Sequence, residues 1–122
     1  MITIVSCSHY PDDERIYHKE IKTLLEKKYS INYFTLSVSD QNLSNKYINH
    51  INYNSATTTI REYIDLVELK IIETSTKVIH IHEPELFSLA TNIKKILGAK
   101  IIYDVHEDYI SMIYTFSKWN KY

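Results

Sequence analysis

Short β-branched apolar runs alternate along the chain with longer stretches whose apolar residues recur at helical spacing. The runs predict strands at 2–7, 31–38, 47–53, 78–82 and 100–105. The third strand contains several polar residues, which predicts that it lies at a sheet edge. The longer stretches predict helices after a cap at Asp12 or Asp13, from a capping box at Thr59, and from Pro84 to a left-handed cap at Gly98. This alternation predicts an α/β domain whose open parallel sheet has about five strands, in the order 3-2-1-4-5, with helices on both faces.

Polar residues gather where three of these strands end. The three groups are Ser8-His9 with Asp12-Asp13 and Arg15, then His80-x-His82-Glu83, then Asp104-x-His106-Glu107-Asp108. The carboxyl ends of parallel strands share one edge of a sheet, and the predicted order reverses between the first and fourth strands. The three groups are therefore expected to flank a single ligand-binding crevice.

His106 is the strongest candidate for chemistry in this crevice. A strand end holds it in place, and an imidazole can donate a hydrogen bond or exchange a proton near neutral pH. His80, inside its strand, is predicted to be a core histidine with satisfied hydrogen bonds. Asp12 and Asp13 fit equally well as helix caps and as site residues. Glu20, on the first helix, is expected to support neighbouring loops.

Composition narrows the classes of function. The 122 residues, 44% of them hydrophobic, suffice for one core, so 1–122 is predicted to be a single domain. With 14 basic and 15 acidic side chains and no basic run, no nucleic-acid partner is expected. The single Cys7 and the lack of any apolar run near 20 residues predict a cytoplasmic protein with at most peripheral membrane contact. Because Gly98 is the only glycine, a glycine-rich dinucleotide or P-loop site is not expected.

A metal site is the competing interpretation of the histidines and carboxylates. His80 and His82, together with the triplet that begins at His106, offer imidazole and carboxylate ligands. However, the sequence contains no cysteine cluster and no His-Glu-x-x-His motif. We therefore expect neither a metal nor another cofactor.

Three segments carry a resemblance to a known family. They are Ser8-His9-Tyr10-Pro11-Asp12-Asp13-Glu14-Arg15-Ile16 with Lys19-Glu20, then His80-Ile81-His82-Glu83-Pro84-Glu85-Leu86, then Ile102-Tyr103-Asp104-Val105-His106-Glu107-Asp108-Tyr109. In this order the segments resemble the N-terminal domain of GT-B glycosyltransferases, specifically the family-four retaining group, and the resemblance covers nearly the whole chain. It implies two Rossmann-like domains facing across a cleft, the first binding mostly acceptor and the second holding the nucleotide-sugar.

The resemblance also implies roles for single residues. His106 matches a family histidine that reaches the donor sugar near the reacting carbon, so a catalytic role is expected for it. Contacts on the acceptor side are expected from Ser8, His9, Asp13, Arg15, His82, Glu83 and Glu107.

Two departures from the family pattern shape the remaining expectations. The glycine-rich turn that many relatives carry after the first strand is replaced by Ser8-His9-Tyr10-Pro11. The basic pair and the spaced glutamates that hold the donor in the family's second domain are absent from this sequence. We therefore expect an N-terminal domain that is incomplete at its C-terminal end and inactive alone, whether as a fragment, a truncated gene product or half of a split enzyme.

The same resemblance sets the expected partners. These are a nucleotide-sugar donor, bound through the missing domain, and a glycan or lipid-linked acceptor of polysaccharide biosynthesis at the inner face of the membrane. The apolar tail after Asp108 and an unprotected last strand predict a homodimer or larger assembly through the C-terminal region, or else a tail that folds over the exposed strand. The alternative is a non-catalytic binding or scaffold module.

Overall fold

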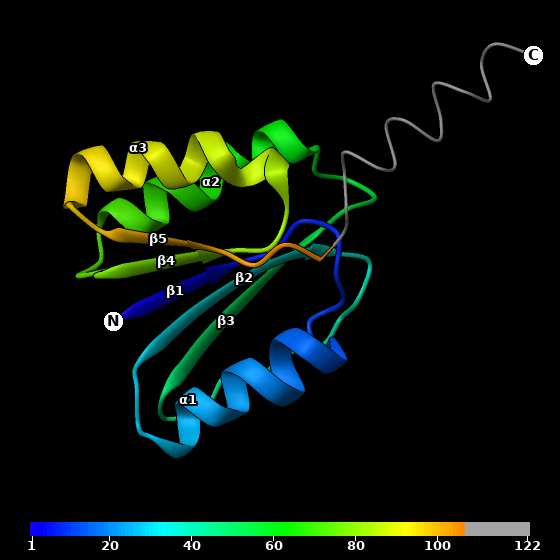
Figure 1. The fold of residues 1–122 in the computed structure, drawn as a ribbon. Coiled ribbons are helices and arrows are strands. Elements are labelled where there is room, and N and C mark those ends of the chain that lie inside the picture. Colours follow the sequence, from blue (N-terminus) through cyan, green and yellow to red (C-terminus); the bar gives the residue numbers. More distant parts are fainter. Residues whose placement is uncertain (107–122) are drawn as a thin grey trace, which may run out of the picture.

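Five parallel strands form one open sheet in the order β3-β2-β1-β4-β5 (Figure 1), which confirms the predicted α/β, Rossmann-like fold. The structure is a computed structural model, and it describes residues 1–106. The strands are β1 Ile2–Val5, β2 Ile31–Ser37, β3 Ile48–Asn54, β4 Val78–Ile81 and β5 Lys100–Tyr103. Because β1 pairs with β2 on one side and with β4 on the other, the strand order reverses beside β1, as the sequence predicts.

Helices cover both faces of the sheet, with α2 and α3 on one face and α1 on the other (Figure 1). The helical elements are η1 Glu14–Ile21 running into α1 Lys22–Glu26, α2 Ile60–Ile72, and η2 Pro84–Leu86 running into α3 Phe87–Leu97. The caps follow the sequence prediction, since Asp13 accepts hydrogen bonds from two backbone N–H groups at the start of η1. Thr59 likewise accepts the Glu62 N–H at the start of α2.

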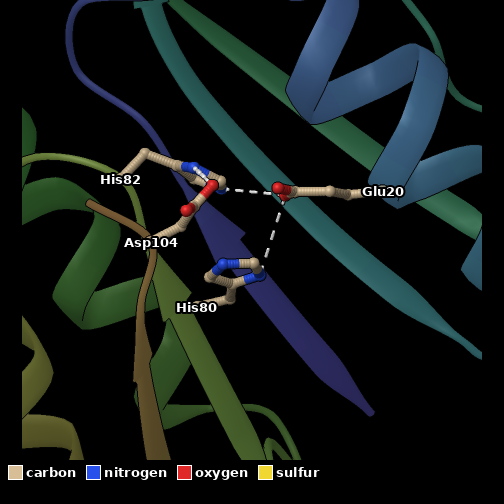
Figure 2. Close-up of side chains that lie close together, drawn as sticks. All are labelled: Glu20, His80, His82 and Asp104. Carbon is tan, nitrogen blue, oxygen red and sulfur yellow. Dashed lines mark ion pairs between the residues drawn. The ribbon is translucent and has the colours of Figure 1, made fainter. Parts of the chain in front are cut away.

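The first helix departs from the expected α-helical geometry. It is a π-helix over Glu14–Ile21, and the His18 N–H reaches the Asp13 carbonyl at 3.3 Å. Ile16 and Ile21 are fully buried against the sheet. Glu20, which lies between these two residues, is on the side of the helix that faces β4 (Figure 2).

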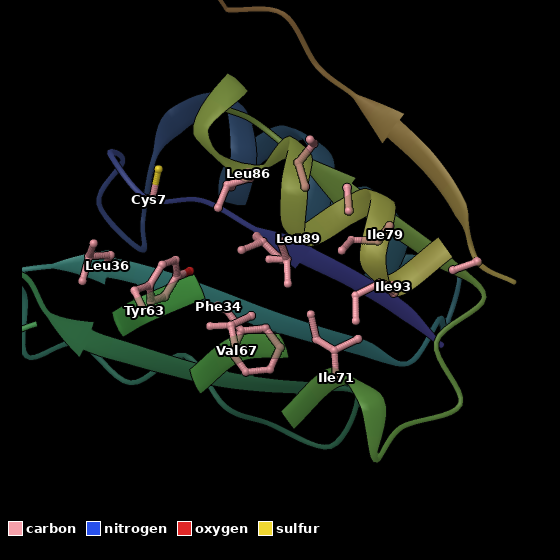
Figure 3. Packing of buried hydrophobic residues seen from close by; sticks show 14 residues of the cluster. Cys7, Phe34, Leu36, Tyr63, Val67, Ile71, Ile79, Leu86, Leu89 and Ile93 are labelled. Atoms are coloured by element: carbon pink, nitrogen blue, oxygen red, sulfur yellow. The ribbon is translucent and has the colours of Figure 1, made fainter. Parts of the chain in front are cut away.

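Two apolar cores lie on opposite faces of the sheet. The larger core joins β1, β2 and β4 to α2 and α3 (Figure 3), through residues such as Phe34, Val67 and Leu89. The smaller core lies on the η1 side of the sheet, where Ile4 of β1 packs with Ile16 and Ile21 of η1. All seven residues of β2 are buried because neighbouring strands and helices cover it, so its polar residues Asn32, Thr35 and Ser37 do not mark an exposed face.

Buried tyrosines tie these cores to the start of the β1 loop. The Tyr63 hydroxyl donates a hydrogen bond of 2.8 Å to the Ser6 carbonyl, and the Tyr33 hydroxyl donates one of 3.2 Å to the Pro11 carbonyl. Both tyrosine side chains are fully buried. These two tyrosines therefore serve packing while each hydroxyl keeps a hydrogen-bond partner.

Several expectations change at the ends of elements. β4 ends at Ile81 and β5 at Tyr103, so His82 and Asp104 lie just beyond their strands. Glu107 and the apolar tail predicted to mediate a homodimer lie outside the described residues. Among residues 1–106, no helix combines the length and apolar character needed to cross a membrane.

Gly98 offers a small test of this fold. It caps α3 in the left-handed region at φ 68°, where a side chain would meet no atom within 4 Å. Gly98→Ala is therefore expected to cost about 1–2 kcal/mol in free energy of unfolding through backbone strain alone. Urea unfolding measures this difference, and an unchanged free energy would contradict the assigned cap. Lys95→Ala, at an exposed position of α3, is the control and should leave the free energy of unfolding nearly unchanged.

Candidate functional site

A buried carboxylate, Glu83, holds the loop that follows β1. Its Oε1 accepts hydrogen bonds from the Ser6 hydroxyl at 2.7 Å, the Ser8 hydroxyl at 2.8 Å and the Ser8 N–H at 3.1 Å. The Cys7 N–H donates to Oε2 at 3.1 Å, and His9 Nδ1 lies 2.6 Å from Oε1. Only 3% of Glu83 is exposed. Glu83, which lies directly before η2, therefore holds the β1 loop in place.

These contacts favour a negative charge on Glu83 and a positive charge on His9. Burial alone would raise the pKa of Glu83, but hydrogen bonds from His9, Ser6, Ser8 and the Cys7 N–H lower it to about 2. The hydrogen bond to Glu83 raises the pKa of His9 above its usual value. Burial raises the pKa of the Cys7 thiol, so this side chain stays protonated. An ionised Glu83 beside a readily protonated His9 thus lies at the carboxyl end of β1.

Four imidazole rings, the first of which is that of His9, form a row across the sheet. The ring centroids of His9 and His106 lie 4.7 Å apart, those of His106 and His82 lie 5.0 Å apart, and those of His82 and His80 lie 4.5 Å apart. His82 Nδ1 and His106 Nε2 are 2.8 Å apart and share a hydrogen bond. The three sequence groups predicted to converge at this edge do so through these rings.

The far end of this row is a cluster of two histidines and two carboxyl groups (Figure 2). Glu20 from η1 points toward His80 and His82, and its Oε2 lies 3.5 Å from His82 Nε2 and 4.0 Å from His80 Nδ1. Asp104 Oδ2 lies 3.6 Å from His82 Nδ1. His80 Nε2 is buried without a hydrogen-bond partner in the described chain, so the prediction of a satisfied core histidine is wrong. β4 places His80 on the face of the sheet toward η1, and no described residue there forms a hydrogen bond with His80 Nε2.

The electrostatics of this cluster favour neutral imidazoles. Burial, together with His80 and His106, lowers the pKa of His82 to about 3, and burial lowers the pKa of His80. Burial and the adjacent Asp104 carboxyl raise the pKa of Glu20 to about 7. Burial would also raise the pKa of Asp104, but its contacts with Glu20 and with the Arg15 guanidinium lower it.

The remaining predicted site residues have structural partners. Asp13 caps η1 through hydrogen bonds of 2.9 Å to the Arg15 and Ile16 N–H groups, which bears out the cap interpretation. The Arg15 side chain pairs with Asp104 and is about half exposed. Glu107 lies outside the described residues. Ser8, His9, His82, Glu83 and His106 are therefore the predicted residues that the structure brings together.

Glu20 is the main residue whose position the sequence interpretation missed. The sequence signal was present, since Glu20 stands four residues after Ile16 and directly before Ile21, within the apolar stripe of the helix. An acidic residue in such a stripe is buried only when it finds a partner. Here His80 and His82, sixty residues later in the chain, lie opposite it.

Two openings give access to the two ends of this row. A cavity of about 320 Å³ borders Ser8 and His9 and is lined further by Tyr10, Ser37 and Val38. A wider and mostly apolar groove of about 520 Å³ reaches the other end, and its lining includes Lys19, Glu20, Thr23, His80 and Ile102. A ligand can therefore approach His9 and Glu20 from separate openings.

The arrangement as a whole provides polar groups at a sheet edge where α/β folds bind ligands. It offers an ionised carboxylate, a histidine that is readily protonated, and a histidine held by a second histidine. Comparison with protein-family models, with curated proteins and with solved structures gives no match to this chain.

Proposed function

We propose that the chain is the acceptor-side domain of a retaining glycosyltransferase, with a GT-B partner domain or partner chain supplying the nucleotide-sugar. The observation that carries the proposal is the convergence of Ser8, His9, His82, Glu83 and His106 beside the strand-order reversal. These residues belong to the segments that resemble the family, although they are separated by up to 98 positions in the sequence. Their clustering supports a shared site.

The proposed chemistry is attack of an acceptor hydroxyl on the anomeric carbon of the donor sugar. The hydroxyl oxygen forms the new bond while the bond from the anomeric carbon to the diphosphate breaks. The hydroxyl proton passes to the departing nucleotide diphosphate, which the second domain stabilises. His106 orients the sugar or stabilises charge as the bond breaks. Its Nε2 is bonded to His82, which leaves Nδ1 as the nitrogen for a substrate.

The other residues have supporting roles in this proposal. Glu83 fixes the β1 loop, so that Ser8 and His9 line the acceptor side beside the 320 Å³ cavity. The residues around this cavity are polar at Ser8, His9 and Ser37, which suits sugar hydroxyls. The proposed acceptor is a glycan or lipid-linked sugar, and the proposed setting is the cytoplasmic side of a membrane.

The isolated chain is expected to show no tight binding of nucleotide-sugars. The groups that would neutralise a diphosphate are assigned to the second domain, and the described β1 loop has no glycine that lets backbone approach phosphate. Calorimetry against a panel of nucleoside diphosphate sugars tests this expectation. Micromolar binding by the chain alone would contradict the division of the site between two domains.

Reconstitution tests the catalytic part. The chain is mixed with the product of an adjacent reading frame that encodes a nucleotide-sugar domain, and transfer of labelled sugar is measured. His106→Ala is expected to lower the transfer rate at least about 100-fold, whereas His18→Ala, on the exposed side of η1, leaves it unchanged. Equal rates for the two variants would remove His106 from the chemistry.

A non-catalytic binding module is the second candidate function. The observation that favours it is that much of the polar site is already bonded internally, since the Glu83 carboxylate is satisfied by the chain's own donors. Under this alternative the partner protein binds wild-type chain and His106→Ala equally, and no sugar transfer accompanies binding. Pull-down of the reconstitution partner, measured beside the transfer assay, separates the two functions.

A further inference from the structure

Four potential metal ligands from separate segments meet between η1 and the sheet. They are Glu20 on η1, His80 on β4, His82 directly after β4, and Asp104 directly after β5 (Figure 2). One ligand atom from each side chain lies within 4.8 Å of the other three. The sequence separates the first of these residues from the last by 84 positions, so the fold creates the group.

Four buried polar atoms of this cluster lack hydrogen-bond partners among the described residues. Buried side-chain atoms without a hydrogen-bond partner among the described residues number five, and four of them are Glu20 Oε2, His80 Nε2, His82 Nε2 and Asp104 Oδ2. His82 is fully buried. Burying polar atoms without partners is costly, and such atoms are rare in folded proteins. Their concentration in one cluster points to a missing common partner.

A cation is the partner that this chemistry calls for. The four side chains offer two carboxyl groups and two imidazole rings, and none of them is a lysine or arginine with a permanent positive charge. Arg15 is the nearest cation, but it contacts Asp104 Oδ1 and lies 3.9 Å from Glu20 Oε1, which are the opposite oxygens of these carboxyls. Glu20 Oε2 and Asp104 Oδ2 therefore have no permanent cation as a partner among the described residues.

We propose that Glu20, His80, His82 and Asp104 bind a divalent first-row transition-metal ion, with Zn²⁺ as the best fit. Zn²⁺ accepts two imidazole nitrogens and two carboxylate oxygens at about 2.0–2.2 Å in tetrahedral sites. Such bond lengths put neighbouring ligand atoms roughly 3.4 Å apart. Glu20 Oε2 and His82 Nε2 are already 3.5 Å apart.

The surroundings supply the outer contacts that metal ligands use. His82 presents Nε2 toward Glu20 while its Nδ1 is bonded to His106 Nε2, which holds the ring in place. Arg15 holds the other oxygen of Asp104 in the same way. The 520 Å³ groove that is lined in part by Glu20 and His80 provides an entry path for the ion.

This inference shares His82 with the proposed sugar site but does not depend on sugar transfer, and it departs from the expectation of no metal. The sequence patterns paired His80 and His82 with the triplet after Val105, whereas the fold pairs them with Glu20 and Asp104. The competing explanation is a proton shared between Glu20 and Asp104, whose carboxyl groups are adjacent. Metal titration distinguishes the two, since a shared proton alone gives no specific metal binding.

The test is titration of the full chain with Zn²⁺ and Co²⁺, after purification without affinity-tag metals and dialysis against chelator. We expect one equivalent of each ion by calorimetry, and for Co²⁺ a visible spectrum of four-coordinate nitrogen and oxygen ligation. Glu20→Gln and His80→Ala are each expected to weaken Zn²⁺ binding at least about tenfold. His18→Ala, which removes an exposed histidine from the same helix, should bind like wild type.

A second measurement covers the case in which a cluster variant fails to fold. In wild-type protein, nitrogen NMR of the histidine rings is recorded with and without Zn²⁺, and the signals of His80 and His82 are expected to shift while those of His18 and His50 do not. Absence of saturable binding by the wild type, equal affinity in Glu20→Gln, or shifts confined to His18 would each overturn the proposal. Loss of sugar transfer has no bearing on these readouts.

Discussion

Glu83→Ala is expected to lower the free energy of unfolding by about 3–5 kcal/mol at neutral pH. The substitution leaves the buried Ser6 hydroxyl, the Cys7 N–H and the Ser8 groups without their acceptor, and it leaves His9 without its counter-ion. Uncompensated donors and charges in a buried site carry the full cost of removal from water. Urea unfolding followed by circular dichroism measures the loss.

Two further variants show what the loss is due to. Glu83→Gln keeps the shape and one acceptor oxygen but removes the charge, so it is expected to fall between wild type and Glu83→Ala. Glu85→Ala removes an exposed glutamate two residues later and is expected to change the free energy of unfolding by less than about 0.5 kcal/mol. If Glu83→Ala were no worse than Glu85→Ala, Glu83 would not be the residue that holds the β1 loop.

The fold was predictable from the sequence because its determinants are local. The β-branched runs, the Asp13 and Thr59 caps and the left-handed Gly98 each act within a few residues, and the structure confirms all of them. The strand order followed from the general rules that connect alternating strands and helices. The π-helical turns over Glu14–Ile21 could not be predicted in this way, since the apolar spacing of the segment also fits an ordinary α-helix.

The candidate site was predictable only in part, because side-chain partners depend on register. Parallel pairing sets Val5 beside Ile81, and this brings the residues that follow each strand next to each other. The position of Glu83 was therefore predictable, but its five hydrogen bonds to the opposite loop were not. The position of Glu20 opposite His82 depends on how η1 packs across the sheet, which no local pattern specifies.

Acidification is expected to destabilise the fold strongly, because the folded chain keeps buried histidines neutral that are protonated in the unfolded chain. Burial lowers the pKa of His50 to about 4, and burial with neighbouring histidines lowers that of His82 to about 3. The His50 ring is already bonded on both nitrogens, to the Thr35 hydroxyl at 2.8 Å and to the Leu43 N–H at 3.3 Å. His50 and His82 bind a proton more readily in the unfolded chain than in the folded chain. The free energy of unfolding therefore falls as pH drops below about 6.5.

The lowered pKa of Glu83 extends this loss of stability to lower pH, whereas the raised pKa of Glu20 opposes it. The lowered pKa of Glu83, about 2 against an ordinary 4.5, corresponds to about 3 kcal/mol of stability that disappears between about pH 4.5 and pH 2. Glu20 behaves oppositely, because its pKa near 7 lets the folded state bind a proton first, and this contribution is complete below about pH 4.5. The raised pKa of His9 likewise favours the folded state below its ordinary value of 6.5 and is lost as pH rises.

The balance of these terms is a net loss of roughly 3–5 kcal/mol in free energy of unfolding between about pH 7 and pH 4. Urea unfolding at several pH values, with chelator present so that no metal holds His82, measures the slope. His50→Asn, which keeps an acceptor for the Leu43 N–H but cannot titrate, is expected to flatten the slope between about pH 6.5 and pH 4 by about 3 kcal/mol. His18→Ala removes an exposed histidine and should leave the slope unchanged. A stability that stayed level down to pH 4 in wild type would mean that the buried histidines accept protons without disturbing the fold.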